Sequence, residues 1–354
     1  MTKIIHLEQS RVARTQGRRD TGSLRRLAVV TPVLDDWRSL AILVQNIERH
    51  VAPEVDWIEI IAVDDGSVEP FDPESIQLSP GGRVRALRIV HLALNLGHQR
   101  AIAVGLVKVA AREDLQGVIV MDCDGEDRPE EIPLLLAEAR SRPGQIILAH
   151  RSKRSETAMF RTGYMAYKFF FRALTGRRIS FGHFSVLPFA AVQRLVHMPE
   201  SWNNLPAAIM RSRMRYAMTD TVRGIRHTGQ SKMNFPGLIV HGLSAMSVYT
   251  DVIFVRVLLM MGGVSLMSLA TLLAVLAIRF NSTLAIPGWA TVVFGDLLII
   301  LFQAMLMIAV TSLMILAGRS ARPMVPVVDA PVYVCGETEI RPDPHLRRGR
   351  TGAE

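Results

Sequence analysis

Three acidic side chains follow a short apolar stretch in the first half of this 354-residue chain, and they have the chemistry of a metal-diphosphate site. Asp122, Asp124 and Glu126 come directly after Gly117–Met121. In an extended segment, residues i, i+2 and i+4 share one face, so the three carboxylates are expected to converge on one cation. Such oxygen ligands suit Mg2+ or Mn2+, which complete their coordination with water and phosphate oxygens. The alternative is an acidic turn that caps a helix beginning near Pro129.

Strand and helix patterns alternate around these carboxylates. Apolar runs predict buried strands, and the spacing of Leu40, Leu43, Val44 and Ile47 predicts a helix between the first two strands. The predicted strands cover residues 27–34, 57–63, 84–91, 118–121 and 145–149, and the predicted helices cover 37–50, 98–112 and 129–140. This alternation predicts an α/β fold with a mostly parallel sheet that helices cover on both faces.

Polar residues gather where three of these strands end. Thr31, the segment Asp64–Ser67 and the acidic residues all fall at carboxyl ends of predicted strands. In parallel sheets, ligands bind beyond these ends, so we expect one pocket there. A Gly-x-Gly-x-x-Gly loop is missing after the first strand, which argues against a dinucleotide-dependent oxidoreductase.

Five short motifs occur in a fixed order along the chain. They are Val29–Val33, Val63–Ser67, Asn95–Gly97, Met121–Asp127 and Arg226–Lys232. Together they resemble the inverting GT-A glycosyltransferases of family 2, in particular the polyprenyl-phosphate branch related to dolichol-phosphate mannose synthase. The resemblance covers about residues 27–317. It implies a Rossmann-like GT-A domain, a nucleotide diphosphate sugar donor and a bound Mg2+ or Mn2+.

The resemblance also implies roles for individual residues. Asp122 and Asp124 match catalytic positions that, with Glu126, lie around the metal and the donor diphosphate, although relatives usually have Gln at the place of Glu126. Asn95–Gly97 has a structural alternative, namely a glycine turn before a helix. Donor nucleotide binding is implied for Thr31, Val33, Asp64, Asp65, Asn95, Gly97 and Arg100, with His98 in the same loop.

The basic segment Arg226–Lys232 lies about twenty residues before the first long apolar run. Guanidinium and ammonium groups bind phosphate, Arg as a fork and Lys as a point charge. The resemblance makes Arg226, Ser231 and Lys232 the candidates for binding a lipid phosphate. The alternative is a solvated basic loop that is attracted to anionic lipids.

His183 marks a departure from the family pattern. The segment Phe181–Leu187 stands where a Gly-Asp-Phe-Arg pattern is frequent in the branch. His183, which we include among the catalytic candidates, could be a general base, an acceptor contact or a structural substitute. A lipid phosphate is already an anion and needs no base, whereas a hydroxyl acceptor requires one within hydrogen-bond reach.

Two uncharged stretches predict a transmembrane hairpin. Residues 257–278 and 297–317 carry no charged side chain, and about 20 apolar residues suffice to cross a bilayer as a helix. We expect spans at about 254–278 and 291–317. Positive charges follow the second span, so the loop between the spans is expected to face outward and both termini the cytoplasm.

The chain therefore divides into five predicted parts. Its net charge of +9 is concentrated in the tails and near the membrane, which fits anionic lipid better than nucleic acid. Two cysteines indicate neither a disulfide framework nor a zinc site. The parts are a basic flexible arm at 1–26, a catalytic domain at 27–232, juxtamembrane amphipathic helices at 233–251, a hairpin at 252–318 and a flexible cytoplasmic tail at 319–354.

The resulting hypothesis is a membrane-bound, metal-dependent enzyme that moves a single sugar, with inversion, to a polyprenyl phosphate at the cytoplasmic leaflet. A Gln-x-x-Arg-Trp signature of processive synthases is missing, which favours single-sugar transfer. One alternative is transfer to a hydroxyl of a lipid-linked or cell-wall glycan. A second is a non-catalytic scaffold or nucleotide sensor. Homo-oligomers formed through the hairpins are a further expectation, with Gly262, Gly263 and Ser265 as a hint of close packing.

Overall fold

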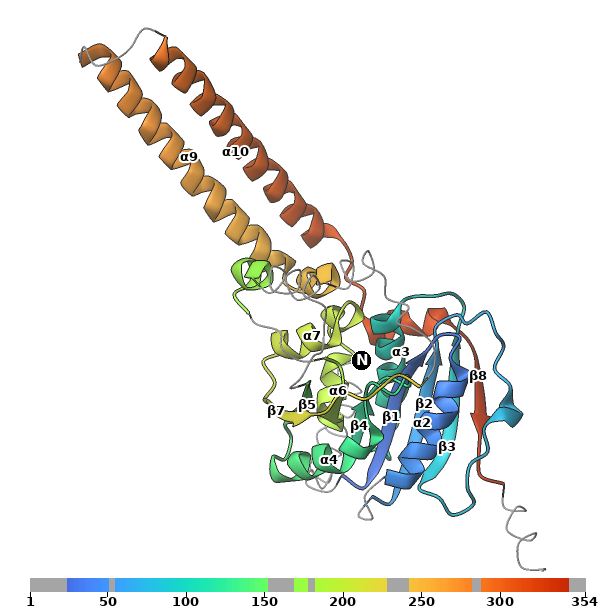
Figure 1. The fold of residues 1–354 in the computed structure, drawn as a ribbon. Coiled ribbons are helices and arrows are strands. Elements are labelled where there is room, and N and C mark those ends of the chain that lie inside the picture. Colours follow the sequence, from blue (N-terminus) through green and yellow to red (C-terminus); the bar gives the residue numbers. More distant parts are fainter. Residues whose placement is uncertain are drawn as a thin grey trace, which may run out of the picture. The chain divides into compact units, whose positions relative to one another are not determined.

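The computed structural model describes residues 24–50, 55–151, 169–177, 182–227, 242–281 and 288–343 (Figure 1). The chain forms two compact units. One comprises Met1–Thr157, Ile179–Val248 and Met324–Glu354, and the other comprises Ala158–Arg178 and Tyr249–Pro323. The first unit thus combines three separate stretches of the sequence.

The first unit contains every strand that the structure describes. The strands are β1 (Arg26–Val33), β2 (Trp57–Asp64), β3 (Val84–Leu92), β4 (Gly117–Val120), β5 (Ile146–Arg151), β6 (Ser185–Pro188), β7 (Tyr216–Thr221) and β8 (Val334–Ile340). Its helices are α2 (Trp37–His50), α3 (His98–Ala110), α4 (Ile132–Ser141), α6 (Phe189–Leu195), α7 (Leu205–Arg211) and α11 (Pro326–Asp329), with 3-10 helices η1 (Pro73–Ser75), η2 (Pro129–Glu131), η3 (Pro199–Trp202) and η4 (Ala330–Tyr333). The five strands predicted from the sequence and the three helices predicted at 37–50, 98–112 and 129–140 are present, with ends that differ by only a few residues.

Within the described residues, the strands form a single sheet in the order β7-β5-β6-β4-β1-β2-β3-β8. β1, β2, β3 and β4 are parallel to one another, as are β5 and β7. β6 runs antiparallel to both β4 and β5, and β8 runs antiparallel to β3. Because β6 is antiparallel to both of its neighbours, β4 and β5, the strands β5 and β7 run in the same direction as β4. The expected mostly parallel α/β sheet is confirmed.

Helices pack on both faces of this sheet, as predicted. On one face, α3, α6 and α7 cover the apolar side chains of β1, β2 and β4. On the other face, α2 and α4 cover a second cluster that includes Val29, Ile60 and Ile119 (Figure 1). The central strands are buried on both sides, which explains why they read as continuous apolar runs.

The C-terminal segment corrects one prediction. Residues 319–354 were expected to form a flexible tail, but residues 326–340 form α11, η4 and β8, and β8 extends the sheet beside β3. β8 lies at the sheet edge, where alternate residues remain exposed, so it has no apolar run that would reveal it. The first unit therefore extends beyond residues 27–232, the limits predicted for the catalytic domain. Residues 344–354 lie outside the described part of the chain.

The second unit contains two long apolar helices, α9 (Thr250–Asn281) and α10 (Trp289–Ser320). Each has 32 residues, or about 48 Å at 1.5 Å per residue, which exceeds the hydrocarbon thickness of a bilayer. Both predicted spans lie within these helices.

In a water-soluble pair of helices the large apolar side chains are buried, whereas in this hairpin small side chains are buried and large apolar ones are exposed. The side chains that are buried are Ser268 and Val275 in α9 and Ala304 and Thr311 in α10, spaced by seven residues, which is the repeat of a helix–helix seam. Leucine and methionine side chains such as Leu266 and Met314 face outward. Both helices are therefore long and apolar enough to cross a membrane, and their exposed surface suits a lipid environment.

Residues that precede α9 include part of the predicted juxtamembrane segment. Of residues 233–251, the structure describes 242–251, and 242–247 are helical. Residues 242–248 belong to the first unit. In the second unit, a short helix at 169–175 exposes Phe169 and Phe170, and Arg256 of α9 donates a hydrogen bond of 2.6 Å to the carbonyl oxygen of Ala173. A cation at the last turn of a helix is favourable because the carbonyl groups there lack partners.

Candidate active site

Two adjacent aspartates at the end of β2 organise the loops at the carboxyl edge of the sheet. Asp65 is only 3% exposed. Its carboxylate accepts hydrogen bonds from the backbone of Leu96, at 2.7 Å, and of Gly97, at 3.0 Å. Burial raises the pKa of Asp65, and these two hydrogen bonds act in the opposite direction. Asp65 thus joins two of the predicted motifs, the segment at 64–67 and the loop at 95–97.

Asp64 uses both carboxylate oxygens within the protein. Oδ1 accepts a hydrogen bond of 2.9 Å from the backbone of Ser67, and Oδ2 lies 2.9 Å from Nδ1 of His91. Asp64 therefore shapes the turn after β2. Its two oxygens are engaged by neighbouring residues, and its predicted role in binding the donor nucleotide stays a prediction.

The other predicted nucleotide contacts differ in their accessibility. Thr31 is fully buried, and its hydroxyl has no hydrogen-bond partner among the described residues. Val33 packs in the core, while its backbone oxygen accepts a hydrogen bond of 2.8 Å from Asp65. Asn95 is exposed, and Arg100 lies with its guanidinium carbon 5.9 Å from the ring centre of Trp202. Gly97 has a φ of 92°, a conformation that favours glycine, at the start of α3.

The acidic segment does not have the extended conformation that the sequence argument assumed. β4 ends at Val120, and residues 123–127 bend, with a φ of 93° at Gly125. Asp122 lies against two histidines, whereas Asp124 and Glu126 both contact Arg226. The structure brings together a different group of potential ligands.

Asp122 lies between two histidines. Its Oδ1 is 3.0 Å from Nε2 of His183 and 3.4 Å from Nε2 of His98, and the two imidazole rings are 4.7 Å apart. Asp127 is also close, with Oδ2 at 3.6 Å from the same nitrogen of His183. Among the described residues, His98, Asp122 and His183 are the group whose ligand atoms lie near enough to one another to hold a metal ion. His183 was a candidate from the sequence, whereas His98 was noted only as part of a loop.

Asp124 and Glu126 instead pair with arginines from the segment after β7. Oδ2 of Asp124 is 2.6 Å from Nη2 of Arg226, and Oε1 of Glu126 is 2.7 Å from Nη2 of Arg223 and 3.4 Å from Nε of Arg226. Backbone hydrogen bonds of 2.9 Å from His227 to Asp124 and from Gly224 to Glu126 hold the two segments together. Arg226 was predicted to lie near the membrane and the lipid phosphate. Ser231 and Lys232 lie outside the described residues.

Burial raises the pKa of two ionisable side chains in this region. It raises the pKa of Asp124 to about 6, with the nearby Asp122 acting in the same direction and Arg226 in the opposite one. Burial also raises the pKa of the Cys123 thiol, which lies between the two aspartates in sequence. The site thus combines partly buried acids, two imidazoles and two guanidinium groups.

The donor set of His98, Asp122 and His183 fits a first-row divalent cation. Imidazole nitrogen suits transition metals, and carboxylate oxygen suits Mn2+ as well as Mg2+, so a mixed set favours Mn2+ over Mg2+. The predicted set of Asp122, Asp124 and Glu126 shares only Asp122 with this group.

Comparison with known proteins assigns the domain. Residues 28–197 match the model of the family described as glycosyl transferase family 2. This segment is a family 2 glycosyltransferase domain. It contains β1 to β6 and most of the residues at the carboxyl edge, including both histidines of the potential metal site.

The chain is also similar to named relatives and to a solved structure. It is 26% identical over 280 residues to undecaprenyl-phosphate 4-deoxy-4-formamido-L-arabinose transferase of Yersinia enterocolitica, covering 77% of this chain and 81% of that protein. It is 26% identical to dodecaprenyl-phosphate galacturonate synthase of Rhizobium johnstonii, covering 43% and 44%. A crystal structure of glucosyl-3-phosphoglycerate synthase from Mycobacterium tuberculosis with Mn2+ and UDP-glucose matches 67% of this chain and 82% of its own, with a TM-score of 0.46 and 14% identity.

The acidic segment and the segment after β7 are in close backbone contact, and a substitution at Gly224 tests this contact. A Cβ atom on Gly224 would collide with the carbonyl oxygen of Gly125. We expect Gly224→Ala to cost about 1–3 kcal/mol of unfolding free energy and to lower the thermal midpoint, because neither backbone segment can yield easily. Gly182→Ala, where a Cβ atom meets nothing within 4 Å, serves as the control and should unfold like the wild type. Equal midpoints for all three proteins would contradict the close contact.

Proposed function

We propose that the protein is a membrane-bound glycosyltransferase that moves one sugar from a nucleotide diphosphate sugar to a polyprenyl phosphate, with inversion, at the cytoplasmic leaflet. The observation that carries this proposal is the 2.6 Å pair between Arg226 and Asp124, directly beside the His98–Asp122–His183 group. Cation ligands and a phosphate-binding guanidinium thus lie in one site at the carboxyl edge of the sheet. Two similar proteins are named for transfer involving undecaprenyl or dodecaprenyl phosphate, which supports this acceptor class.

The proposed reaction is a single displacement at the anomeric carbon of the donor sugar. An oxygen of the lipid phosphate forms a bond to that carbon while the bond to the nucleoside diphosphate oxygen breaks. The attacking oxygen is already anionic, so no residue has to remove a proton. The leaving diphosphate accumulates negative charge, which Arg226 and Arg223 are placed to stabilise once they exchange Asp124 and Glu126 for phosphate oxygens.

A divalent cation belongs to this proposal, with His98, Asp122 and His183 as the residues that would hold it. When bound, it would neutralise developing charge on the diphosphate. Asp127 helps to fix the position of Asp122, because its Oδ2 accepts a hydrogen bond of 3.0 Å from the backbone of Asp122. The set inferred from the sequence, Asp122, Asp124 and Glu126, would require Arg223 and Arg226 to leave first.

A hydroxyl acceptor is the second candidate function. It is favoured by the position of His183, whose Nε2 lies between the carboxylates of Asp122 and Asp127 at 3.0 and 3.6 Å. With Nε2 donating to these carboxylates, Nδ1 of the neutral ring would be the atom that accepts a proton from a sugar hydroxyl, and the carboxylates would stabilise the imidazolium that forms.

The first prediction concerns the reaction itself. Full-length protein in detergent, supplied with Mn2+ and a panel of labelled UDP- and GDP-sugars, should transfer label to a polyprenyl phosphate and not to the corresponding polyprenol. Thin-layer separation of the lipid products measures this difference. Label on the polyprenol or on a lipid-linked glycan alone would favour the hydroxyl acceptor, and no metal-dependent nucleotide binding at all would favour a non-catalytic scaffold.

The second prediction separates the two metal sets. We expect His183→Ala to weaken Mn2+ binding at least about tenfold, since even outer partners of metal ligands contribute that much. Asp124→Asn should bind Mn2+ like the wild type. The matched control is His150→Ala, which removes a similar histidine–aspartate pair, 2.8 Å from Asp220, outside the site. Titration of free Mn2+ by electron paramagnetic resonance measures affinity without turnover. Loss of binding in Asp124→Asn but not in His183→Ala would restore the set inferred from the sequence.

The third prediction tests the orientation in the membrane. Cys335 is exposed, whereas Cys123 is buried and its raised pKa disfavours the reactive thiolate. A membrane-impermeant maleimide should label Cys335 in inside-out vesicles and leave it unlabelled in intact cells. In a Cys335→Ser background, Ser282→Cys in the loop between the spans should give the opposite result. Labelling of Cys335 in intact cells would reverse the proposed orientation.

A further inference from the structure

β8, which follows the hairpin in the sequence, is the last strand of the sheet and lies beside β3. It pairs antiparallel with β3, with Thr338 opposite Ile89 and Glu337 opposite Val90. Alternate residues of a strand point to opposite faces, so Glu337 and Glu339 lie on one face and Thr338 lies on the other. Each face makes its own polar contacts with the rest of the domain.

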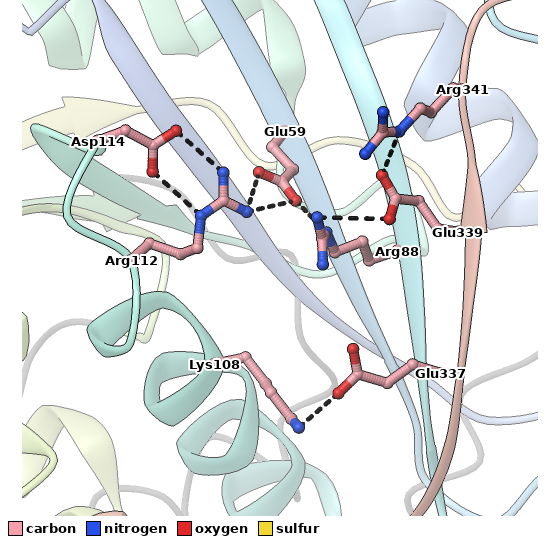
Figure 2. Close-up of polar contacts among 8 residues, drawn as sticks. All are labelled: Glu59, Arg88, Lys108, Arg112, Asp114, Glu337, Glu339 and Arg341. Carbon is pink, nitrogen blue, oxygen red and sulfur yellow. Dashed lines mark hydrogen bonds and ion pairs between the residues drawn. The ribbon is translucent and has the colours of Figure 1, made fainter.

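The first face of β8 joins a network of ion pairs, shown in Figure 2. Glu337 lies 2.5 Å from Nζ of Lys108 on α3, and Glu339 lies 3.4 Å from Arg88 on β3. Arg88 also pairs with Glu59. The Glu59 side chain is 4% exposed and has a second partner in Arg112, at 2.8 Å, which in turn pairs with Asp114. Because a buried carboxylate needs compensating charge, this network ties β8 to a part of the sheet that is costly to disturb.

Thr338, on the second face of β8, is linked through His91 to Asp64 at the carboxyl edge of the sheet. Oγ1 of Thr338 lies 3.0 Å from Nε2 of His91, and Nδ1 of His91 lies 2.9 Å from Oδ2 of Asp64. If Nδ1 donates to the carboxylate, Nε2 of a neutral ring is an acceptor, and the Thr338 hydroxyl can donate to it. Asp64 then accepts the backbone hydrogen bond of Ser67 with its other oxygen. The three side chains lie on adjacent strands β8, β3 and β2.

This relay fixes the orientation of the Asp64 carboxylate. The Ser67 hydroxyl in turn accepts a hydrogen bond of 2.9 Å from the backbone of Asp35, after β1. The side chain of Asp35 accepts a hydrogen bond of 2.7 Å from the backbone of Val68. Rotation of the Asp64 carboxylate would therefore disturb the turns after β1 and β2 together.

We propose that Thr338 and His91 are positioning residues for the donor nucleotide and that β8 is required for its affinity. The inference rests on the proposed function, because it assumes that a nucleotide binds at the turns after β1 and β2. Neither residue is placed to touch the reacting atoms. Their effect is on donor affinity, through Asp64, and not on the affinity for the lipid acceptor.

The test uses the full-length protein in detergent and the UDP- or GDP-sugar that binds the wild type best in the presence of Mn2+. Thr338→Val keeps the shape of the side chain and removes its hydroxyl. We expect the dissociation constant and the donor KM to rise about two- to tenfold, the usual range for one hydrogen bond, with the acceptor KM unchanged. Thr338→Ser restores the hydroxyl and should bind the donor like the wild type.

Glu337→Gln is the matched control, since it loses an ion pair on the opposite face of the same strand. It should leave donor affinity unchanged, and thermal midpoints show whether each variant is folded. Equal donor affinity in Thr338→Val and wild type would overturn the inference, as would an equal loss in Glu337→Gln, which would indicate a purely structural role. If the wild type binds no nucleotide, the proposed function fails and this inference fails with it, whereas the preceding outcomes leave the proposed function intact.

Discussion

A carboxylate that is removed from water must be given hydrogen-bond donors or a counter-charge, and the candidate active site depends on this constraint. Asp64, Asp65 and Asp124 are all buried at the carboxyl ends of strands. The donors that satisfy them are backbone groups of the loops at the same edge, those of Ser67, Leu96 and Glu126. The aspartates therefore determine the conformation of these loops, and the loops in turn define the surface that a ligand meets.

The same constraint explains why the C-terminal strand belongs to the domain. Glu59 is buried in β2 and is balanced by Arg88 and Arg112, and Arg88 also contacts Glu339 of β8. β8 also covers the edge of β3, whose backbone groups would otherwise remain open for pairing with another chain. A single short strand thus contributes both a sheet edge and part of a charge network, although it is separated from the other strands by the whole hairpin.

The sequence was sufficient for the parts of the fold that are buried on both sides. β1, β2 and β3 were predicted with nearly correct ends, because a strand covered on both faces must be almost entirely apolar. The two long helices were predicted for a similar reason, since lipid-facing residues are apolar all round. β8 was missed because alternate residues of this edge strand are exposed, so Cys335, Glu337 and Glu339 interrupt the kind of apolar run by which the central strands were recognised.

The composition of the site was predicted less well than its location. Asp122, Asp124, His183 and Arg226 were all identified, and the structure brings them to one edge of the sheet. Their grouping as one ligand set stays a prediction, but the extended conformation expected for the segment is wrong, because residues 123–127 bend. Asp122 lies against His183, whereas Asp124 pairs with Arg226. Arg223 and His98 were not recognised as partners, since a contact between loops distant in sequence leaves no periodic signal.

The observed grouping also has an electrostatic consequence for any cation at this edge. Arg226 lies 2.6 Å from Asp124, and a guanidinium and a divalent cation cannot both lie against one carboxylate without strong repulsion. A cation at Asp124 would therefore displace Arg226, the residue best placed to bind a phosphate. A cation held by His98, Asp122 and His183 would not compete with Arg226 for Asp124, so Arg226 would leave that carboxylate only for the oxygens of an arriving anionic ligand. Because Asp122 lies against His183 while Asp124 pairs with Arg226, the two positive charges would have different carboxylate partners within one site.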